Sequence, residues 1–128
     1  MSKLHSLRLS VSVALLLGAI ALPAQSQQAD GVKLFSQQCA ACHSIVAGAP
    51  PGLGPNLHGV LGRPAGQIKG FAYSAEFKKA LAKKNWTPEL LDKWLEDPQN
   101  VAAGTYMMYQ QPDATVRSAI IDYLKTVK

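Results

Sequence analysis

The sequence has few cysteines and no long hydrophobic run. Cys39 and Cys42 are its only cysteines among 128 residues. The longest apolar run, from Leu9 to Leu22, is interrupted only by two serines and is shorter than the ~20 residues that cross a membrane. The sequence also contains no internal repeat and no clear strand pattern, which argues against repeat architectures and β-rich folds. These absences indicate one small domain without a sheet.

The first 26 residues resemble a secretory signal peptide. Lys3 and Arg8 are their only charged residues, the apolar run follows, and Ala24-Gln25-Ser26 supplies the small residues of a cleavage site. We therefore predict a signal peptide over residues 1–26, cleaved after Ser26, and an exported, periplasmic domain over residues 27–128. No stable membrane span is expected after cleavage. The alternative is an uncleaved membrane anchor, for which the apolar run is short.

The predicted mature chain is short and only mildly basic. Its 102 residues carry 11 Lys and Arg and eight Asp and Glu, a net charge of +3. This excess is well below that of nucleic-acid-binding proteins, so no nucleic-acid partner is expected. A chain of this length buries a limited core and often needs a metal or a cofactor for stability.

Four helical stretches predict an all-α fold of short helices and long loops. The first runs from about Asp30 to Cys39, and the second is capped by Ser74 and ends near Lys84. Thr87 and Pro88 open a third helix that stops at Asp97-Pro98. After an irregular segment from Asn100 to Pro112, the last helix carries an apolar stripe: Val116, Ile120, Leu124 and Val127. The glycine- and proline-rich stretch from residue 47 to residue 66 predicts a functional loop.

The most informative motif is Cys39-Ala40-Ala41-Cys42-His43, a C-x-x-C-H run that is typical of c-type haem attachment. Each thiol can add to one of two vinyl groups of the porphyrin, which holds the adjacent histidine against the iron. A thioredoxin-like pair would need a βαβ context, and zinc would need four ligands, whereas His58 is the only other histidine of the mature chain. A structural disulfide would leave His43 unexplained.

The mature chain resembles the class I cytochromes c over nearly its whole length. The resemblance rests on four blocks of sequence: Gly31 and Phe35 before the C-x-x-C-H motif, residues 54–63, residues 70–74 with Trp86, and residues 104–109 with Arg117 and residues 121–124. It implies the small cytochrome c fold around one haem c (iron) per chain, bound covalently through Cys39 and Cys42. It also implies that Gly31 lets the first helix cross the last one closely, beside Phe35 and Tyr123.

The resemblance assigns the remaining site residues. His43 would be the proximal iron ligand, with the Pro55 carbonyl accepting its ring N–H. Met107 would be the distal ligand, in preference to the adjacent Met108, because it follows Gly104-Thr105 as the family ligand does. Four further residues match positions that contact the haem propionates: Arg63, Tyr73, Trp86 and Thr105. For Tyr73 and Trp86 the alternative is core packing. His58 is expected to be a loop residue.

Two departures from the family pattern bear on function. Trp94 stands where a tyrosine usually reaches the methionine sulfur, so that hydrogen bond is not predicted from the resemblance. The family's ring of lysines around the haem edge is missing, since the matching positions are Gln38, Gln99, Asn100 and Tyr106. The lysines lie instead at positions 78, 79, 83 and 84, where a solvated helix face is the simpler interpretation.

With both axial ligands supplied by the chain, the iron would have no open position, which favours electron transfer over catalysis. We therefore expect a periplasmic single-electron carrier and not an enzyme. Its partners would be a periplasmic dehydrogenase or respiratory complex as donor, and an oxidase or reductase as acceptor. The alternative hypothesis is a haem subunit or dedicated acceptor of one dehydrogenase, docked through an uncharged face.

Overall fold

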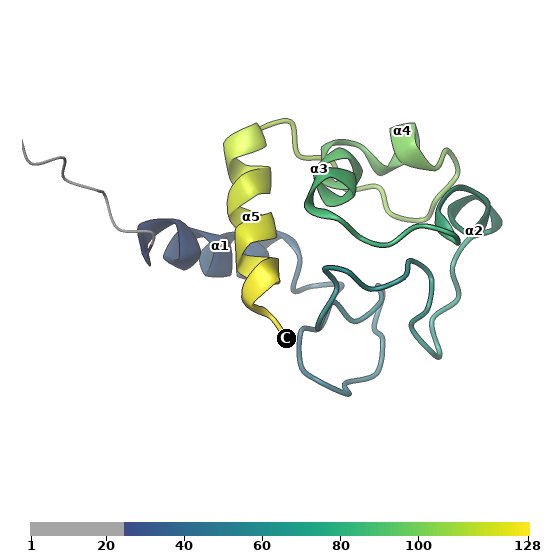
Figure 1. Ribbon diagram of the computed structural model, residues 1–128, viewed down its shortest axis with the longest axis horizontal. Helices are drawn as coiled ribbons and strands as arrows, with labels where there is room; N and C mark the ends of the chain where they lie inside the picture. The colour runs from purple at the N-terminus through teal and green to yellow at the C-terminus, as the bar shows by residue number, and fades with distance from the viewer. Residues whose placement is uncertain (1–24) are drawn as a thin grey trace, which may run out of the picture.

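The computed structural model describes residues 25–128 as a set of short helices joined by long loops (Figure 1). The helices are α1 (Gln25–Gln38), α2 (Ala75–Leu81), α3 (Pro88–Glu96), α4 (Pro98–Val101) and α5 (Ala114–Thr126). Within these residues the only β-type pairing is an isolated bridge between Pro64 and Asn85. The predicted all-α fold is confirmed.

Helices α1 and α5 cross at close range (Figure 1). Gly31 makes this possible, because a Cβ built on it would meet the Ala119 carbonyl oxygen and would lie 2.7 Å from Tyr123 Cβ. Phe35 then packs edge-on against Tyr123, with ring centroids 5.6 Å apart. The expected role of Gly31, Phe35 and Tyr123 is confirmed, and the crossing joins the two ends of the domain.

Local capping sets the start of each later helix. The Ser74 hydroxyl accepts a hydrogen bond from Phe77 N, and the Thr87 hydroxyl accepts one from Leu90 N, as their N-cap positions predict. Asp97 ends α3 and caps α4, its carboxylate accepting from Gln99 N. The Asp113 carboxylate caps α5. These four caps fix where α2, α3, α4 and α5 begin.

Three predicted boundaries differ from the structure. Helix α1 begins at Gln25 and not at Asp30, and α2 ends at Leu81 and not near Lys84. The second difference arises because residues 84–86 leave the helix to bond with the backbone of residues 62–65. The segment from Asn100 to Pro112 is predicted to be irregular, but its first two residues belong to a four-residue helix, α4, with Pro98 at its first position.

The stripe predicted on the last helix is only partly correct. Ile120 and Leu124 are buried, but Val116 is half-buried, and Arg117 occupies a core position instead. The Arg117 guanidinium donates to the Asp92 carboxylate at 2.7 Å and to the carbonyls of Gln111 and Pro112. The Asp92 carboxylate raises the pKa of Arg117, so the side chain stays charged and ties α5 to α3.

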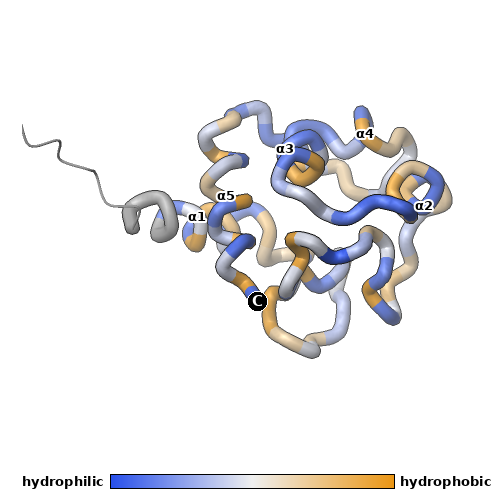
Figure 2. Tube along the Cα trace, viewed as in Figure 1, coloured by the Kyte–Doolittle hydropathy of each residue, from blue (hydrophilic) through white to orange (hydrophobic). Residues whose placement is uncertain are grey.

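Three large aromatic side chains contribute to a common core beneath α2 and α3. Phe77, Trp86 and Trp94 contact one another with ring centroids 5.4 to 6.3 Å apart. Figure 2 shows, by contrast, that the connection from α2 to α3 is hydrophilic, which agrees with the exposed Lys83 and Lys84 in it. The long loop of residues 47–66 has no regular structure and runs beside this core.

The N-terminal prediction remains a prediction. Residues 1–24, which make up most of the predicted signal peptide, lie outside the described residues, and Ser26 lies in the first turn of α1. In the part of the chain that the structure describes, no helix is both long and apolar enough to span a bilayer.

Candidate functional site

A largely apolar cavity of about 320 Å³ lies in the middle of the domain. The C-x-x-C-H segment, the glycine-rich loop and the segment after α4 all contribute to its wall. Residues far apart in the sequence therefore meet there, among them Cys39, His43, Trp86, Trp94 and Met107. A cavity of this kind, apolar with a few polar atoms, is typical of a cofactor site.

His43 is held in one orientation by the glycine-rich loop. Its Nδ1 lies 2.7 Å from the Pro55 carbonyl oxygen and donates to it, which leaves Nε2 as the ring nitrogen with a lone pair. A Cβ on Gly54 would collide with the imidazole, lying 2.6 Å from Nδ1. Burial lowers the pKa of His43, against the opposing effect of the Pro55 hydrogen bond. The imidazole is therefore neutral near pH 7, as a metal ligand must be.

The two cysteines lie beside this histidine on the turn that follows α1. His43 N and Cys42 N both donate to the Cys39 carbonyl, so the motif forms a compact turn. Both thiols are free. Burial, and secondarily the proximity of Cys42, raises the pKa of Cys39 to about 11. Cys39 is thus protonated at neutral pH, unlike the low-pKa thiol of a redox pair.

Met107 and Met108 occupy different environments. Met107 is half-buried and lines the cavity, and its Sδ accepts a hydrogen bond of 3.1 Å from Trp94 Nε1. Met108 is 75 % exposed. The hydrogen bond to the sulfur, which the sequence did not predict, is therefore present, with an indole as donor. The geometry favours Met107 over Met108 as the thioether available to a group bound in the cavity.

The four residues expected at the propionates all line the cavity, but they have different local partners. Arg63 Nη1 and Nη2 donate to the carbonyls of His58 and Asn56, each at 2.8 Å, which uses two of its five N–H donors. Tyr73 stacks on Phe77 at 4.7 Å. Trp86 and Thr105 are buried. Among the described residues, no group accepts a hydrogen bond from Trp86 Nε1, so this donor is available to a bound group.

The donor set of the cavity fits a c-type haem. It comprises the His43 imidazole, the half-buried Met107 thioether, and the Cys39 and Cys42 thiols, which are the groups that ligate and anchor such a haem. Within residues 25–128 no group of three or more His, Cys, Asp or Glu side chains could hold a bare metal ion. His58 is half-buried outside the cavity wall, and its main chain contacts Asn56 and Arg63.

Several residues that shape the site were not singled out for these roles from the sequence. The buried Asn56 amide donates to the carbonyls of Val46 and Ala49 and so fixes the glycine-rich loop. Gln99 makes side-chain hydrogen bonds to the segment that carries Met107. The Gln38 side chain accepts hydrogen bonds from Tyr109 and Gln111, which follow Met108 in the chain. A buried asparagine inside a turn-rich run is a usable signal, whereas the two glutamines carry none.

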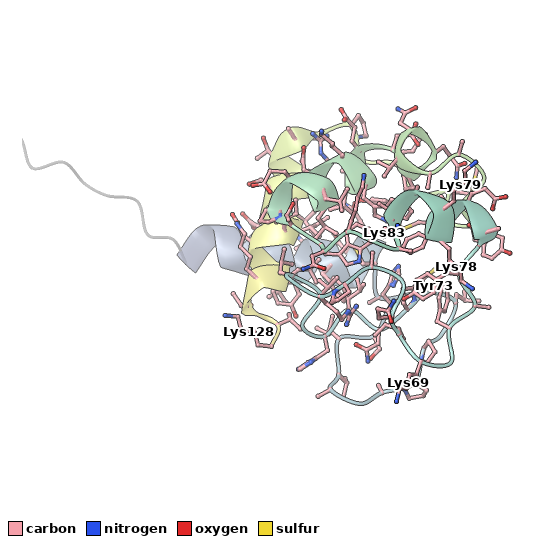
Figure 3. The ribbon with its side chains drawn as sticks, turned by 45° about the vertical axis from the view of Figure 1, so that its right-hand side comes forward. Lys69, Tyr73, Lys78, Lys79, Lys83 and Lys128 are labelled. Carbon is pink, nitrogen blue, oxygen red and sulfur yellow. The ribbon has the colours of Figure 1, made fainter. Side chains whose placement is uncertain are left out.

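The cavity opens at a rim without lysines. Leu53, Tyr106 and Met108 line it and are 82 %, 71 % and 75 % exposed. No described lysine lines it: Lys78 and Lys79 lie on α2, Lys83 and Lys84 follow it, and Lys69 lies on a separate loop (Figure 3). None of these five lysines makes an ion pair with a described residue. The uncharged edge that the sequence predicts is thus also apolar and exposed.

Comparison with known proteins gives a consistent result. The family model described as cytochrome c matches residues 28–128. A cytochrome c2 of Rhodopila globiformis is 42 % identical over 101 residues, which cover 77 % of this chain and 92 % of the relative. A cytochrome c-550 of Ancylobacter novellus is 37 % identical over 100 residues, with the same two coverages. A "cytochrome c-type cyt cy" of Rhodobacter capsulatus is 39 % identical over 98 residues, but this chain spans only 47 % of its length.

Proposed function

Because the chain belongs to the cytochrome c family, we propose that it carries single electrons in the periplasm on one haem c whose iron is bound by His43 and Met107. Family membership establishes the covalently attached haem c and the role of electron carrier. The two ligands, the attachment residues and the location are our proposal. The haem supplies an iron that gains and loses one electron.

The observation that carries the ligand assignment is the environment of the two donor atoms. The Pro55 carbonyl fixes the tautomer of His43, so that Nε2 can bind a metal. Trp94 Nε1 holds the Met107 sulfur in the wall of the same cavity. Two chain-supplied ligands would leave no open coordination site for a substrate, so we propose a carrier without enzymatic activity.

The other cavity residues serve to bind the prosthetic group and to exclude water. Cys39 and Cys42 would each form a thioether with it, which makes its loss from the protein impossible without breaking a covalent bond. Arg63, Tyr73, Trp86 and Thr105 would contact its propionates, because buried carboxylates need polar partners. Phe77 and Leu124 supply apolar surface to the same cavity.

The proposed location and partners rest on the N-terminal sequence and on the exposed rim. We propose that residues 1–26 direct export and that the donor is a periplasmic dehydrogenase or respiratory complex, with an oxidase or reductase as acceptor. The exposed, uncharged rim of Leu53, Tyr106 and Met108 also supports a second candidate, a dedicated acceptor of one dehydrogenase. The resemblance of nearly the whole mature chain to the electron carriers of this family favours the mobile carrier.

Expression of the full chain together with a cytochrome maturation system tests this proposal. The periplasmic fraction should contain a red protein that keeps its colour after acid–acetone extraction and that is reduced and reoxidised reversibly. Cys39→Ala or Cys42→Ala should weaken attachment, and His43→Ala should abolish stable ligation. A matched control is Ser44→Ala, whose hydroxyl contacts only Val46 N among the described residues. Colour lost to acid–acetone in the wild type would refute covalent attachment through these cysteines.

A further inference from the structure

The side chain of Gln99, on α4, binds the backbone of the segment that leads into and includes Met107. Its Nε2 donates to the Thr105 carbonyl at 2.9 Å and to the Met107 carbonyl at 3.2 Å. Its Oε1 accepts from Gly104 N at 2.9 Å. Both ends of one amide therefore bind three backbone groups within four consecutive residues, and Nε2 also lies 3.4 Å from the sulfur of Met108.

A second glutamine holds the chain on the other side of Met107. Gln38, the last residue of α1, accepts two hydrogen bonds at Oε1, from the Tyr109 hydroxyl at 2.6 Å and from Gln111 Nε2 at 3.0 Å. These bonds join positions more than 70 residues apart in the sequence. Gln38 also immediately precedes Cys39, so the anchor of this segment is next to the haem-attachment turn.

Apart from these side-chain hydrogen bonds, the segment of residues 104–111 has few bonds to the helices. Residues 104–111 form no helix or strand, so their backbone groups depend on side chains or water for partners. The segment's backbone bonds to the helices are at its end, where Gln111 N donates to the Leu95 carbonyl and the Gln111 carbonyl accepts from Arg117. The position of Met107 is therefore set mainly by Gln99 before it, Gln38 after it, and Trp94 at its sulfur.

We propose that Gln99 and Gln38 are positioning residues that hold Met107 against displacement from the haem iron by small external ligands. The inference rests on the proposed ligation by Met107. For an external ligand to enter, the sulfur must leave and the segment must move away from the cavity. In the wild type this movement breaks the Gln99 hydrogen bonds, the Gln38 hydrogen bonds, or both. Removing either side chain lowers the free-energy cost of opening and leaves the ligand atoms themselves unchanged.

The test measures how imidazole, added to the oxidised holoprotein, replaces the methionine. The loss of the methionine-to-ferric-iron absorption band reports the exchange. Gln99→Leu removes three hydrogen bonds to the backbone and one to Met108 Sδ, and it should bind imidazole about tenfold or more tightly than the wild type. Gln99→Glu keeps the acceptor for Gly104 N but turns a carboxylate oxygen toward the Thr105 and Met107 carbonyls, so it should also bind imidazole more tightly than the wild type. Gln38→Leu should act in the same direction through the other side of the segment.

Two controls separate this role from general stability. Asn100→Leu and Gln110→Leu change exposed amides that make no side-chain hydrogen bond among the described residues, and should leave imidazole binding unchanged. Thermal unfolding of every variant identifies those whose fold is weakened. Wild-type imidazole affinity in folded Gln99→Leu and Gln38→Leu, with the band present, would overturn this inference alone. Absence of the band from the wild-type holoprotein would overturn the Met107 ligation and the inference together.

Discussion

Trp94 Nε1 donates a hydrogen bond to the sulfur of Met107, 3.1 Å away, from a position 13 residues earlier in the chain. The indole lies in the aromatic group with Phe77 and Trp86, so its direction is fixed by packing on both sides. A donor at the sulfur withdraws electron density from it. With the ligation proposed above, the thioether would therefore be a weaker ligand, above all for the more electron-poor ferric iron.

The first prediction concerns this hydrogen bond. Trp94→Phe removes the donor, so it should stabilise the ferric state and lower the reduction potential. One neutral hydrogen bond of roughly 0.5–1.5 kcal/mol corresponds to about 20–60 mV for a one-electron couple. Potentiometric titration of the holoprotein measures the shift. Trp94→His, which can restore an N–H donor, serves as the comparison, and a potential in Trp94→Phe equal to or above that of the wild type would contradict the argument.

The second prediction separates the two adjacent methionines. Met107→Ala should remove the methionine-to-ferric-iron absorption band and lower the reduction potential, because the soft ligand is lost. Met108→Ala removes an exposed side chain and should leave the band in place. Absorption spectra of the oxidised proteins decide the question. The reverse pattern would move the ligand by one residue and would mean that the segment changes register when haem binds.

The third prediction concerns docking at the rim. Electrostatic steering depends on opposed charges and is screened within ~10 Å at 0.1 M salt. Because Leu53, Tyr106 and Met108 form an exposed rim without lysines, reduction by the native donor should depend only weakly on ionic strength. Stopped-flow rates over a salt series provide the measurement.

A charge-reversal variant tests whether the lysines on and after α2 steer docking. Changing Lys78, Lys79, Lys83 and Lys84 to glutamate should alter the reduction rate little, since these exposed residues lie on and after α2. Changing the exposed Lys33, Lys93, Lys125 and Lys128 to glutamate reverses the same number of charges away from α2 and controls for the change in net charge. A steep salt dependence that disappears in the fourfold variant would restore a carrier steered by these lysines.

The fourth prediction concerns the helix crossing. Gly31→Ala places a methyl group against the Ala119 carbonyl and 2.7 Å from Tyr123 Cβ. Helices α1 and α5 must then separate, at a cost of about 1–3 kcal/mol in the free energy of unfolding. Gly52→Ala is a matched control, because its Cβ would meet only the Cys42 carbonyl, at 3.4 Å. Denaturant unfolding of both holoproteins should show a large loss for the first variant and a small one for the second.

The sequence predicted those parts of the fold that depend on local chemistry. Ser74 and Thr87 mark helix starts because capping needs only a side-chain oxygen near the first backbone N–H groups. Pro88 marks one because the first helical position does not need an N–H donor. The end of α2 was placed too late, since the pairing of residues 84–86 with residues 62–65 is a contact across about 20 residues and has no local signal. Helix α4 is a single turn, which is too short for a periodic pattern.

In the candidate site, too, features with a local sequence signal were predicted and those that depend on distant contacts were not. The C-x-x-C-H spacing and the glycine-rich loop pointed to the cavity, and the resemblance supplied the Pro55 contact to His43, which the structure contains. The donor to Met107 was not predicted, because a tryptophan in place of the usual tyrosine reaches the sulfur by a different ring geometry. Gln99 carried no signal because its partners are mostly backbone groups, and Gln38 carried none because its partners are side chains more than 70 residues away. Only the folded chain brings these groups together.

The crossing of α1 over α5 also sets the size of the loop that the chain must close. Gly31 and Tyr123 are separated by about 90 residues, and closure entropy grows only with the logarithm of loop length, about 0.6 kcal/mol per doubling. A few residues inserted at the exposed turn of Lys69 and Gly70 would therefore barely change the cost of bringing the two ends together. The domain can lengthen at its periphery while its termini stay joined, which makes that turn a suitable place to attach a reporter group.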